Sequence, residues 1–302
     1  MNIALIGIGR VGMPMARHLA AAGHALRVFD TRPAAMARAV SEFGAVATGS
    51  AGEAASGAEQ IILCLPGPVQ DAAALRGPRG VFANAAAGSL VIDTTTITVS
   101  LTRALSHEAL AHGIGFVEAP LSGGAPAAIA GSLTAMIAGD PGDCDRALPV
   151  LESFCSRIHR VGISGEAIAL RLINQAVYVA YMAAFAEGLA IGDAIGIDLE
   201  TMLSVLNDSA AGHPMIASKY DEIRGLSDNG FAIDRAMEYL DLAGEASNHA
   251  ATATPVLNAT RRSLQRAQAL GLSDNDLIVA RNAYLAQAPL AGGGALVEIA
   301  KY

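Results

Sequence analysis

Three glycines near the start of the chain give the clearest chemical signal. Residues 7–12 read Gly-Ile-Gly-Arg-Val-Gly, a GxGxxG pattern directly after the first predicted strand and at the start of a predicted helix. The glycines of this pattern permit a tight turn, close approach of the backbone to a pyrophosphate, and close packing of helix on strand. The helix N-terminus adds free N–H groups and the positive end of a dipole. The pattern therefore predicts a nicotinamide dinucleotide site that includes Gly7, Gly9, Arg10, Val11 and Gly12.

A carboxylate ends the second predicted strand. Asp30 follows Gly12 by 18 residues, a spacing at which an acid accepts hydrogen bonds from the ribose hydroxyls of the adenosine. Such a carboxylate repels a 2'-phosphate, so it favours NAD. Arg32 could instead attract that phosphate, which keeps NADP open as the cofactor. We expect Asp30, Thr31 and Arg32 to form the adenosine end of the site.

The first half of the chain alternates short apolar runs with alanine-rich helical segments. The runs at residues 2–7, 25–30, 60–65, 89–93, 115–118 and 133–138 read as strands. Several of them lack polar alternation, which is typical of parallel strands that helices cover on both faces. Segments 11–22 and 33–43 between them have helical length and composition. This βαβ order predicts an α/β fold, a Rossmann-type doubly wound sheet, in a cofactor-binding domain at 1–162.

The second half, 163–302, is expected to be an all-helical domain for substrate binding and dimerisation. Residues 165–195 read as one long helix, and its stretch 176–186 is apolar on nearly every face, so we expect burial on all sides, between domains or subunits. That stretch is too short to span a membrane. The remaining helices are predicted at 198–208, 213–224, 231–250, 255–269 and 274–287.

Composition narrows the classes of function. The 302 residues carry a net charge of -8 and 52% hydrophobic residues, so the sequence offers no basic surface for nucleic acid or an anionic membrane. The three cysteines are irregularly spaced and no signal segment begins the chain, which predicts a cytoplasmic protein. Of the 20 basic residues only Lys219 and Lys301 are lysines. A mechanism that needs lysine has little to draw on.

Three longer motifs resemble the β-hydroxyacid dehydrogenase family, which includes 3-hydroxyisobutyrate dehydrogenases and tartronate semialdehyde reductases. They read GIGRVGMPMARHLAAAGH at 7–24, DTTTITVS at 93–100 and EAPLSGGAPAAIAGSLTAMIAGD at 118–140, and GLSDNDLIVARNAY at 271–284 extends the match. The resemblance implies a Rossmann domain followed by a helical domain, with the active site in the cleft between them. It also implies homodimers or homotetramers formed through the helical half.

The resemblance assigns further site residues. It places Leu65, Pro66 and Thr96 beside the cofactor, and Ser122, Gly123 and Gly124 around the carboxylate of a small substrate. That loop suits an anion, because two glycines expose consecutive N–H groups and the serine hydroxyl adds a third donor.

The family's two lysines are both absent. The catalytic lysine precedes an Asn-Asn or Asn-Gln pair by three residues; here the pair is Asn174-Gln175 and the earlier position is Arg171. The second lysine aligns with Glu238, which Tyr239 follows. A guanidinium cannot readily exchange a proton, but Arg171 can stabilise negative charge on a substrate oxygen. We expect Arg171 and Asn174 to be catalytic, Gln175 to bind substrate, and water, Tyr178 or Tyr239 to supply the proton.

The leading hypothesis is an NAD(P)-dependent oxidoreductase that interconverts a small 3-hydroxy acid and its aldehyde or ketone. One alternative is an imine reductase-like enzyme, since such sequences resemble this family and carry another residue at the lysine position. A second alternative is a catalytically silent scaffold that binds the cofactor. No metal site is expected, because His107 and His112 are five residues apart and point to different sides of a helix.

Overall fold

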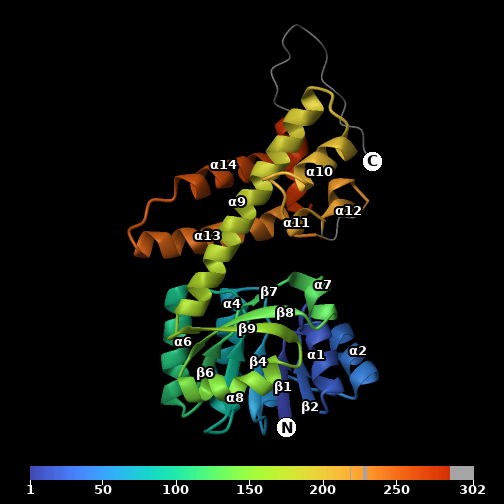
Figure 1. Ribbon diagram of the computed structural model, residues 1–302. Coiled ribbons are helices and arrows are strands. Elements are labelled where there is room, and N and C mark those ends of the chain that lie inside the picture. The colour runs from blue at the N-terminus through green and yellow to red at the C-terminus, as the bar shows by residue number, and fades with distance from the viewer. Residues whose placement is uncertain (218, 227–229, 286–302) are drawn as a thin grey trace. The chain divides into compact units, whose positions relative to one another are not determined.

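The computed structural model describes residues 1–217, 219–226 and 230–285, so Lys301 and the predicted helix end at Gln287 lie outside the described residues. The chain forms two compact units, Met1–Leu172 and the part from Ile173 onward (Figure 1). They divide inside one continuous helix, α9 (Glu166–Ala194). Because this helix belongs to both units, the domain boundary between 162 and 163 stays a prediction.

A nine-stranded sheet forms the centre of the first unit, in the order β3-β2-β1-β4-β5-β6-β8-β7, with β9 beside β8. The strands are β1 (Asn2–Ile6), β2 (Ala25–Phe29), β3 (Val46–Ala47), β4 (Gln60–Leu63), β5 (Leu90–Asp93), β6 (Gly115–Glu118), β7 (Leu121–Ser122), β8 (Leu133–Gly139) and β9 (Cys155–Gly162). Strands β1 to β6 pair in parallel, whereas β8 is antiparallel to β6. The predicted doubly wound α/β fold is confirmed.

Three strands, β3, β7 and β9, were not predicted from the sequence. Strands β3 and β7 are two residues long and give no periodicity. Strand β9 lies at an edge, with Arg157, His159 and Arg160 exposed, so it lacks the apolar run of a buried strand.

The helices of the first unit cover both faces of the sheet. They are α1 (Gly12–Ala21), α2 (Pro33–Phe43), α3 (Ala51–Ala55), α4 (Pro68–Leu75), α5 (Val81–Asn84), α6 (Val99–Ala111), α7 (Gly124–Ile129) and α8 (Pro141–Leu151). Alternate residues of β1 enter two different cores: Ile3 and Leu5 pack in one, Ala4 and Ile6 in the other. The strand is therefore buried on both faces, as its unbroken apolar run predicts.

The second unit is helical, as predicted. Beyond α9 it contains α10 (Leu199–Asn207), α11 (Pro214–Ala217), α12 (Tyr220–Ile223), α13 (Ile233–His249), α14 (Pro255–Ala269), the 3-10 helix η1 (Leu277–Val279) and α15 (Ala280–Leu285). The predicted helix at 213–224 is wrong as one element, because it forms two single-turn helices. The helix predicted from 274 begins instead as η1, where Asp276 caps the backbone N–H of Ile278.

Helix α9 is long and apolar enough to cross a membrane by length and composition alone, and 39% of its most apolar window is buried. The apolar part of α9 is therefore longer than the predicted apolar stretch at 176–186. One side of α9, including Val179, Met182 and Phe185, packs in the core of the helical unit. That role accounts for much of its apolar character.

Within this one chain α9 is not buried on all sides, and the expected burial between domains or subunits stays a prediction. Ile173, Val177, Ile191 and Ile195 are between 59% and 70% exposed. With Ala184 and Gly188, also exposed, they follow one another at intervals of three, four or seven residues and so share one side of the helix. Ile195 lies one residue past the end of α9, where its N–H still donates to the carbonyl of Ile191 at 3.2 Å. We call these six residues the α9 stripe.

A buried carboxylate fixes the start of α9. Glu118, the last residue of β6, accepts hydrogen bonds at Oε1 from the backbone N–H groups of Gly165 (2.8 Å) and Ala167 (3.0 Å). Its other oxygen is buried without a hydrogen-bond partner. Burial outweighs these bonds and raises the pKa of Glu118 to about 7.

We expect Glu118→Gln to remove a pH dependence of stability. Because the folded pKa is raised from 4.5 to about 7, the stability that Glu118 contributes is full below the lower value and is lost as pH rises through the upper one. The loss amounts to at most about 3 kcal/mol. Denaturant unfolding of both proteins across this range should show that the free energy of unfolding of the wild type falls relative to that of the variant as pH rises. Parallel pH profiles would contradict the assignment.

Candidate active site

The dinucleotide turn lies between β1 and the start of α1. Gly7 has φ +91°, and a Cβ on it would lie 2.3 Å from the carbonyl oxygen of Cys64. A Cβ on Gly12 would lie 2.0 Å from the carbonyl oxygen of Gly7. Packing within the chain therefore requires both glycines. A Cβ on Gly9 would meet only the Arg32 guanidinium, at 3.6 Å, so its bare backbone fits the close approach of a pyrophosphate.

The N-terminus of α1 is suited to an anion. Its N-cap is Val11, whose side chain cannot cap, and its first turn contains no acidic residue. Arg10 is exposed in the same turn. No side chain of the first turn of α1 therefore competes with an anion for the backbone N–H groups and the helix dipole.

Asp30 and Arg32 form a bidentate ion pair. Asp30 Oδ1 accepts from Arg32 Nε and Oδ2 from Arg32 Nη2, both at 2.9 Å, and Oδ2 also accepts from the Ile8 N–H at 3.0 Å. Burial alone would raise the pKa of Asp30, but these hydrogen bonds lower it below its usual value. Asp30 is therefore a fixed carboxylate, whereas the Arg32 side chain is 60% exposed and Thr31 between them is exposed.

Four parallel strands bring the predicted cofactor residues to one edge of the sheet. Gly7 follows β1, Asp30 follows β2, Leu65 and Pro66 follow β4, and Thr96 follows β5. Thr96 is buried, and the Leu65 N–H donates to Thr95 Oγ1 at 3.3 Å. Strand β1 lies between β2 and β4, so the strand order reverses there. In open α/β sheets this reversal, at the carboxyl ends of the strands, is where ligands bind.

The predicted carboxylate loop also has an unusual backbone. Ser122 ends β7, Gly123 has φ +122° and Gly124 has φ +63°. A Cβ on Gly123 would lie 2.5 Å from the Cβ of Ala127, so another residue would not fit without a shift. Ser122 is half-buried and both glycines are exposed, an arrangement that leaves backbone donors accessible to an anion.

The predicted catalytic residues lie in the first turns of α9. Arg171 is half-buried in the first unit. Asn174 and Gln175 begin the second unit, and Asn174 Nδ2 donates to Gln175 Oε1 at 3.3 Å. Arg171 and Asn174 are three residues apart and so project to a similar side of the helix. Their roles toward a substrate stay predictions.

The two tyrosines named as proton sources differ from ordinary tyrosines. Burial, with the charges of Asp276 and Glu222, raises the pKa of Tyr178 and makes it a weaker acid. Tyr239 is buried, stacks on Phe231 and receives a hydrogen bond from Arg235 Nη2 at 3.3 Å. Burial therefore disfavours release of a proton by Tyr178.

The lysine that the described residues include has a structural partner. Lys219 Nζ lies 2.6 Å from Asp276 Oδ2, which also accepts from the Phe231 N–H at 2.5 Å. Asp276 is buried, so this ion pair fastens the start of α12 to the start of η1, and the Phe231 N–H joins the segment before α13 to the same carboxylate. Lys219 therefore lies at neither position where the family motif has a lysine, and its ammonium group is held in a structural ion pair.

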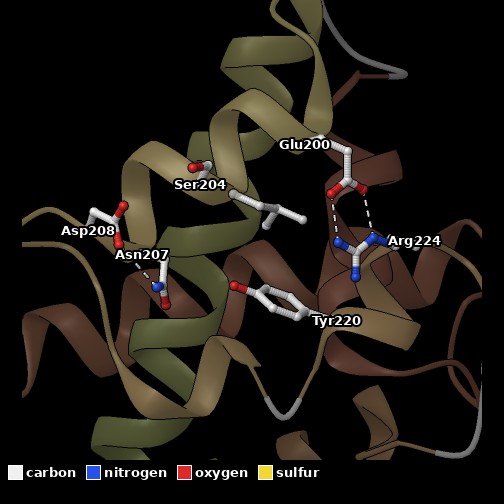
Figure 2. Close-up of a pocket in the computed structure, with 7 residues that line it drawn as sticks. Glu200, Ser204, Asn207, Asp208, Tyr220 and Arg224 are labelled. Atoms are coloured by element: carbon white, nitrogen blue, oxygen red, sulfur yellow. Dashed lines mark hydrogen bonds and ion pairs between the residues drawn. The ribbon is translucent and has the colours of Figure 1, made fainter.

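A cavity of about 250 Å³ lies in the helical unit, and none of its lining residues was singled out from the sequence (Figure 2). Arg224 donates to both oxygens of Glu200 at 2.6 Å and lies over the ring of Tyr220. Asn207 donates to Asp208 at 3.4 Å. Arg224 and Glu200 of the cavity thus bind each other, and none of the lining residues belongs to the predicted site.

We expect Asp30→Ala to change cofactor preference. The variant loses the carboxylate that would bind the ribose hydroxyls and frees Arg32 to meet a 2'-phosphate. NADH affinity should fall about tenfold while NADPH affinity rises. Fluorescence titration with each cofactor measures this. In the control Arg32→Ala, Asp30 remains and no gain for NADPH is expected; an unchanged preference in Asp30→Ala would remove Asp30 from the site.

Comparison with known proteins agrees with this geometry. Residues 2–163 match the NAD binding domain of 6-phosphogluconate dehydrogenase, and residues 165–283 match the NAD-binding domain of NADP-dependent 3-hydroxyisobutyrate dehydrogenase. An NAD-dependent L-serine dehydrogenase from Pseudomonas aeruginosa is 31% identical over 84% of this chain and 88% of its own. A 3-sulfolactaldehyde reductase from Escherichia coli is 30% identical over 91% and 92%.

A solved structure gives the same result. The 3-hydroxyisobutyrate dehydrogenase of Mycobacterium tuberculosis, solved with L-serine, superposes with a TM-score of 0.81 and 28% identity, covering 93% of this chain and 98% of its own. The match spans both halves of the chain, as the resemblance of the motifs predicts. This chain belongs to the β-hydroxyacid dehydrogenase family of NAD(P)-dependent oxidoreductases.

Proposed function

We propose that the protein interconverts a small 3-hydroxy acid and its aldehyde or keto form, with NAD as cofactor and NADP as the alternative. The observation that supports this most is the pairing, in one unit, of the dinucleotide edge with the glycine loop at Ser122–Gly124. The named relatives act on small hydroxyl or aldehyde compounds, including L-serine and 3-sulfolactaldehyde. A carboxylate on the loop would orient such a substrate.

In this proposal the residues of the dinucleotide edge would hold the nicotinamide cofactor, which would supply or accept the hydride. The Ser122 hydroxyl and the N–H groups of Gly123 and Gly124 hold the substrate carboxylate. Arg171 donates hydrogen bonds to the reacting oxygen and stabilises the negative charge that develops there. Asn174 and Gln175 orient the substrate. Because a guanidinium keeps its protons and burial weakens Tyr178 as an acid, water supplies the proton that completes the alcohol.

Turnover tests the reaction. Purified protein with NADH or NADPH is mixed with small aldehyde acids and, separately, with cyclic imines, and loss of the reduced cofactor is followed. We expect turnover of the aldehyde acids. Turnover of imines alone would favour an imine reductase, and cofactor binding without turnover would favour a silent scaffold.

Arg171→Ala tests the proposed charge stabilisation. We expect kcat to fall at least about a hundredfold, the usual cost of losing one such donor, while the Kd for NADH stays within about twofold. Arg171→Lys is the matched control, since it keeps the charge and restores an exchangeable proton. An unchanged kcat in Arg171→Ala would exclude Arg171 from the reaction.

We also propose a homo-oligomer, a dimer or tetramer, formed through the α9 stripe. Four branched aliphatic side chains on one side of a single helix are more than scattered surface exposure. The small residues Ala184 and Gly188 in the same row would allow another helix to approach closely. A cytoplasmic location belongs to the same proposal, and the three free cysteines support it.

We expect Val177→Glu to break the oligomer, because a charge in an apolar interface is left without water or partner. Val205→Glu is the matched control: Val205 is 62% exposed on α10, comparable with Val177 at 65%, and lies off the stripe. Light scattering after size-exclusion chromatography gives the mass of each. An oligomer that survives in Val177→Glu, or is lost equally in both variants, would contradict this interface.

A further inference from the structure

Two carboxylates are buried side by side beneath the cofactor edge, and the reaction proposed above uses neither. Asp71 lies in the first turn of α4 and is fully buried; Asp93 ends β5 and is 2% exposed. Neither oxygen of Asp71 makes a hydrogen bond of ordinary geometry. Their polar neighbours are the carboxylate of Asp93 and the hydroxyl of Thr95.

The charges around the pair do not neutralise it. Arg76 is the cation whose charge reaches Asp71, but it is half-exposed and its Nε donates to Glu108 at 2.8 Å. The Cys64 thiol, which feels the charge of Asp93, is itself uncharged, since burial raises its pKa to about 11. Glu118 is the neighbour of Asp93 across the β5–β6 pairing and adds repulsion.

Two buried carboxylates in contact cannot both be ionised at ordinary cost, so such a pair holds one proton between its members. The electrostatics agree with the geometry. Burial and the charge of Asp93 raise the pKa of Asp71 well above its usual value, and burial raises that of Asp93 to about 6. Both shifts favour the retention of a proton by the pair.

Thr95 connects the pair to the cofactor edge. Its backbone N–H donates to Asp93 Oδ1 at 2.9 Å, and its Oγ1 accepts from the Leu65 N–H at 3.3 Å. The hydroxyl proton of Thr95 is then directed to the carboxylates. Leu65 and the residue after Thr95, Thr96, are two of the residues assigned to the cofactor. Thr95 thus joins the loops after β4 and β5, and its bond to Asp93 connects this junction to the pair.

We propose that Asp71 and Asp93 share a single proton and that Asp71 is a positioning residue, which keeps Leu65 and Thr96 in place for the cofactor only while that proton is bound. The proposal rests on the assigned cofactor edge. Loss of the proton places two negative charges in one buried space and separates the loops. Cofactor affinity and stability are then full at low pH and fall as pH rises, since raised folded pKa values give that sign.

Asp71→Asn tests the proposal, because an amide resembles the protonated acid and does not titrate. The Kd for NADH is measured by fluorescence titration, and unfolding by denaturant, between about pH 5.5 and about pH 9. In the wild type the Kd should rise by up to about tenfold for each pH unit above the upper pKa of the pair. In Asp71→Asn the Kd should change little with pH, and the unfolding profile should keep only the loss of stability assigned to Glu118. Asp145→Asn, an exposed carboxylate paired with Arg160, is the control and should follow the wild type.

The outcomes separate the two proposals. An Asp71→Asn profile parallel to the wild type overturns the shared proton. Absence of NADH binding at every pH instead overturns the cofactor assignment, and the unfolding profiles still test the pair. If Asp71→Asn does not fold, the infrared spectrum of Glu118→Gln at neutral pH decides. The carbonyl band of a protonated carboxylic acid supports the proposal, and its absence overturns it.

Discussion

Strand β1 is buried on both faces, and the candidate site of the first unit depends on that burial. Ile3 and Leu5 fill one core while Ala4 and Ile6 fill the other, so the strand cannot slip by one residue without exchanging all its contacts. Its parallel neighbours β2 and β4 hold the same register. The ends of these strands, with Gly7, Asp30 and Leu65, consequently lie at one edge. The predicted cofactor residues are therefore brought together at the carboxyl ends of the buried strands.

That edge is rich in carboxylates and poor in cations. Asp30 is stabilised as an anion by Arg32, whereas Asp71, Asp93 and Glu118 are buried with few compensating donors, and burial raises the pKa of each of the three. Hydrogen bonds to Asp30 outweigh the effect of burial on its pKa. At the other three carboxyl groups the effect of burial is the larger one. Glu118 couples the sheet to the start of α9, and Asp93 couples it to the loops after β4 and β5.

The scarcity of lysine has a specific meaning in this family. The lysine among the described residues, Lys219, is engaged with a buried carboxylate in the helical unit. Arg171 occupies the position where the family motif has its catalytic lysine. A guanidinium can bind and polarise an oxygen but cannot readily deliver a proton. In the proposed function the reaction therefore needs Arg171 to stabilise charge and a separate group, water, to supply the proton.

Local sequence was sufficient for the features that depend on nearby residues. The glycine turn, the apolar strands at β1, β2, β4, β5, β6 and β8, and the long helix α9 follow from composition and spacing, and the motifs identify the family. Features that depend on pairing between distant segments did not follow. Edge strand β9 has no apolar run, and the helix predicted at 213–224 breaks in two.

Only the tertiary structure decided which charges meet. Asp71 and Asp93 are 22 residues apart and lie on different elements, so no spacing rule places them together. The sequence likewise predicted that α9 is apolar, but only packing determined which side enters the core and which remains exposed. Periodicity reports that a surface is apolar. Which segment packs against that surface depends on long-range contacts, and no local pattern of a single sequence encodes them.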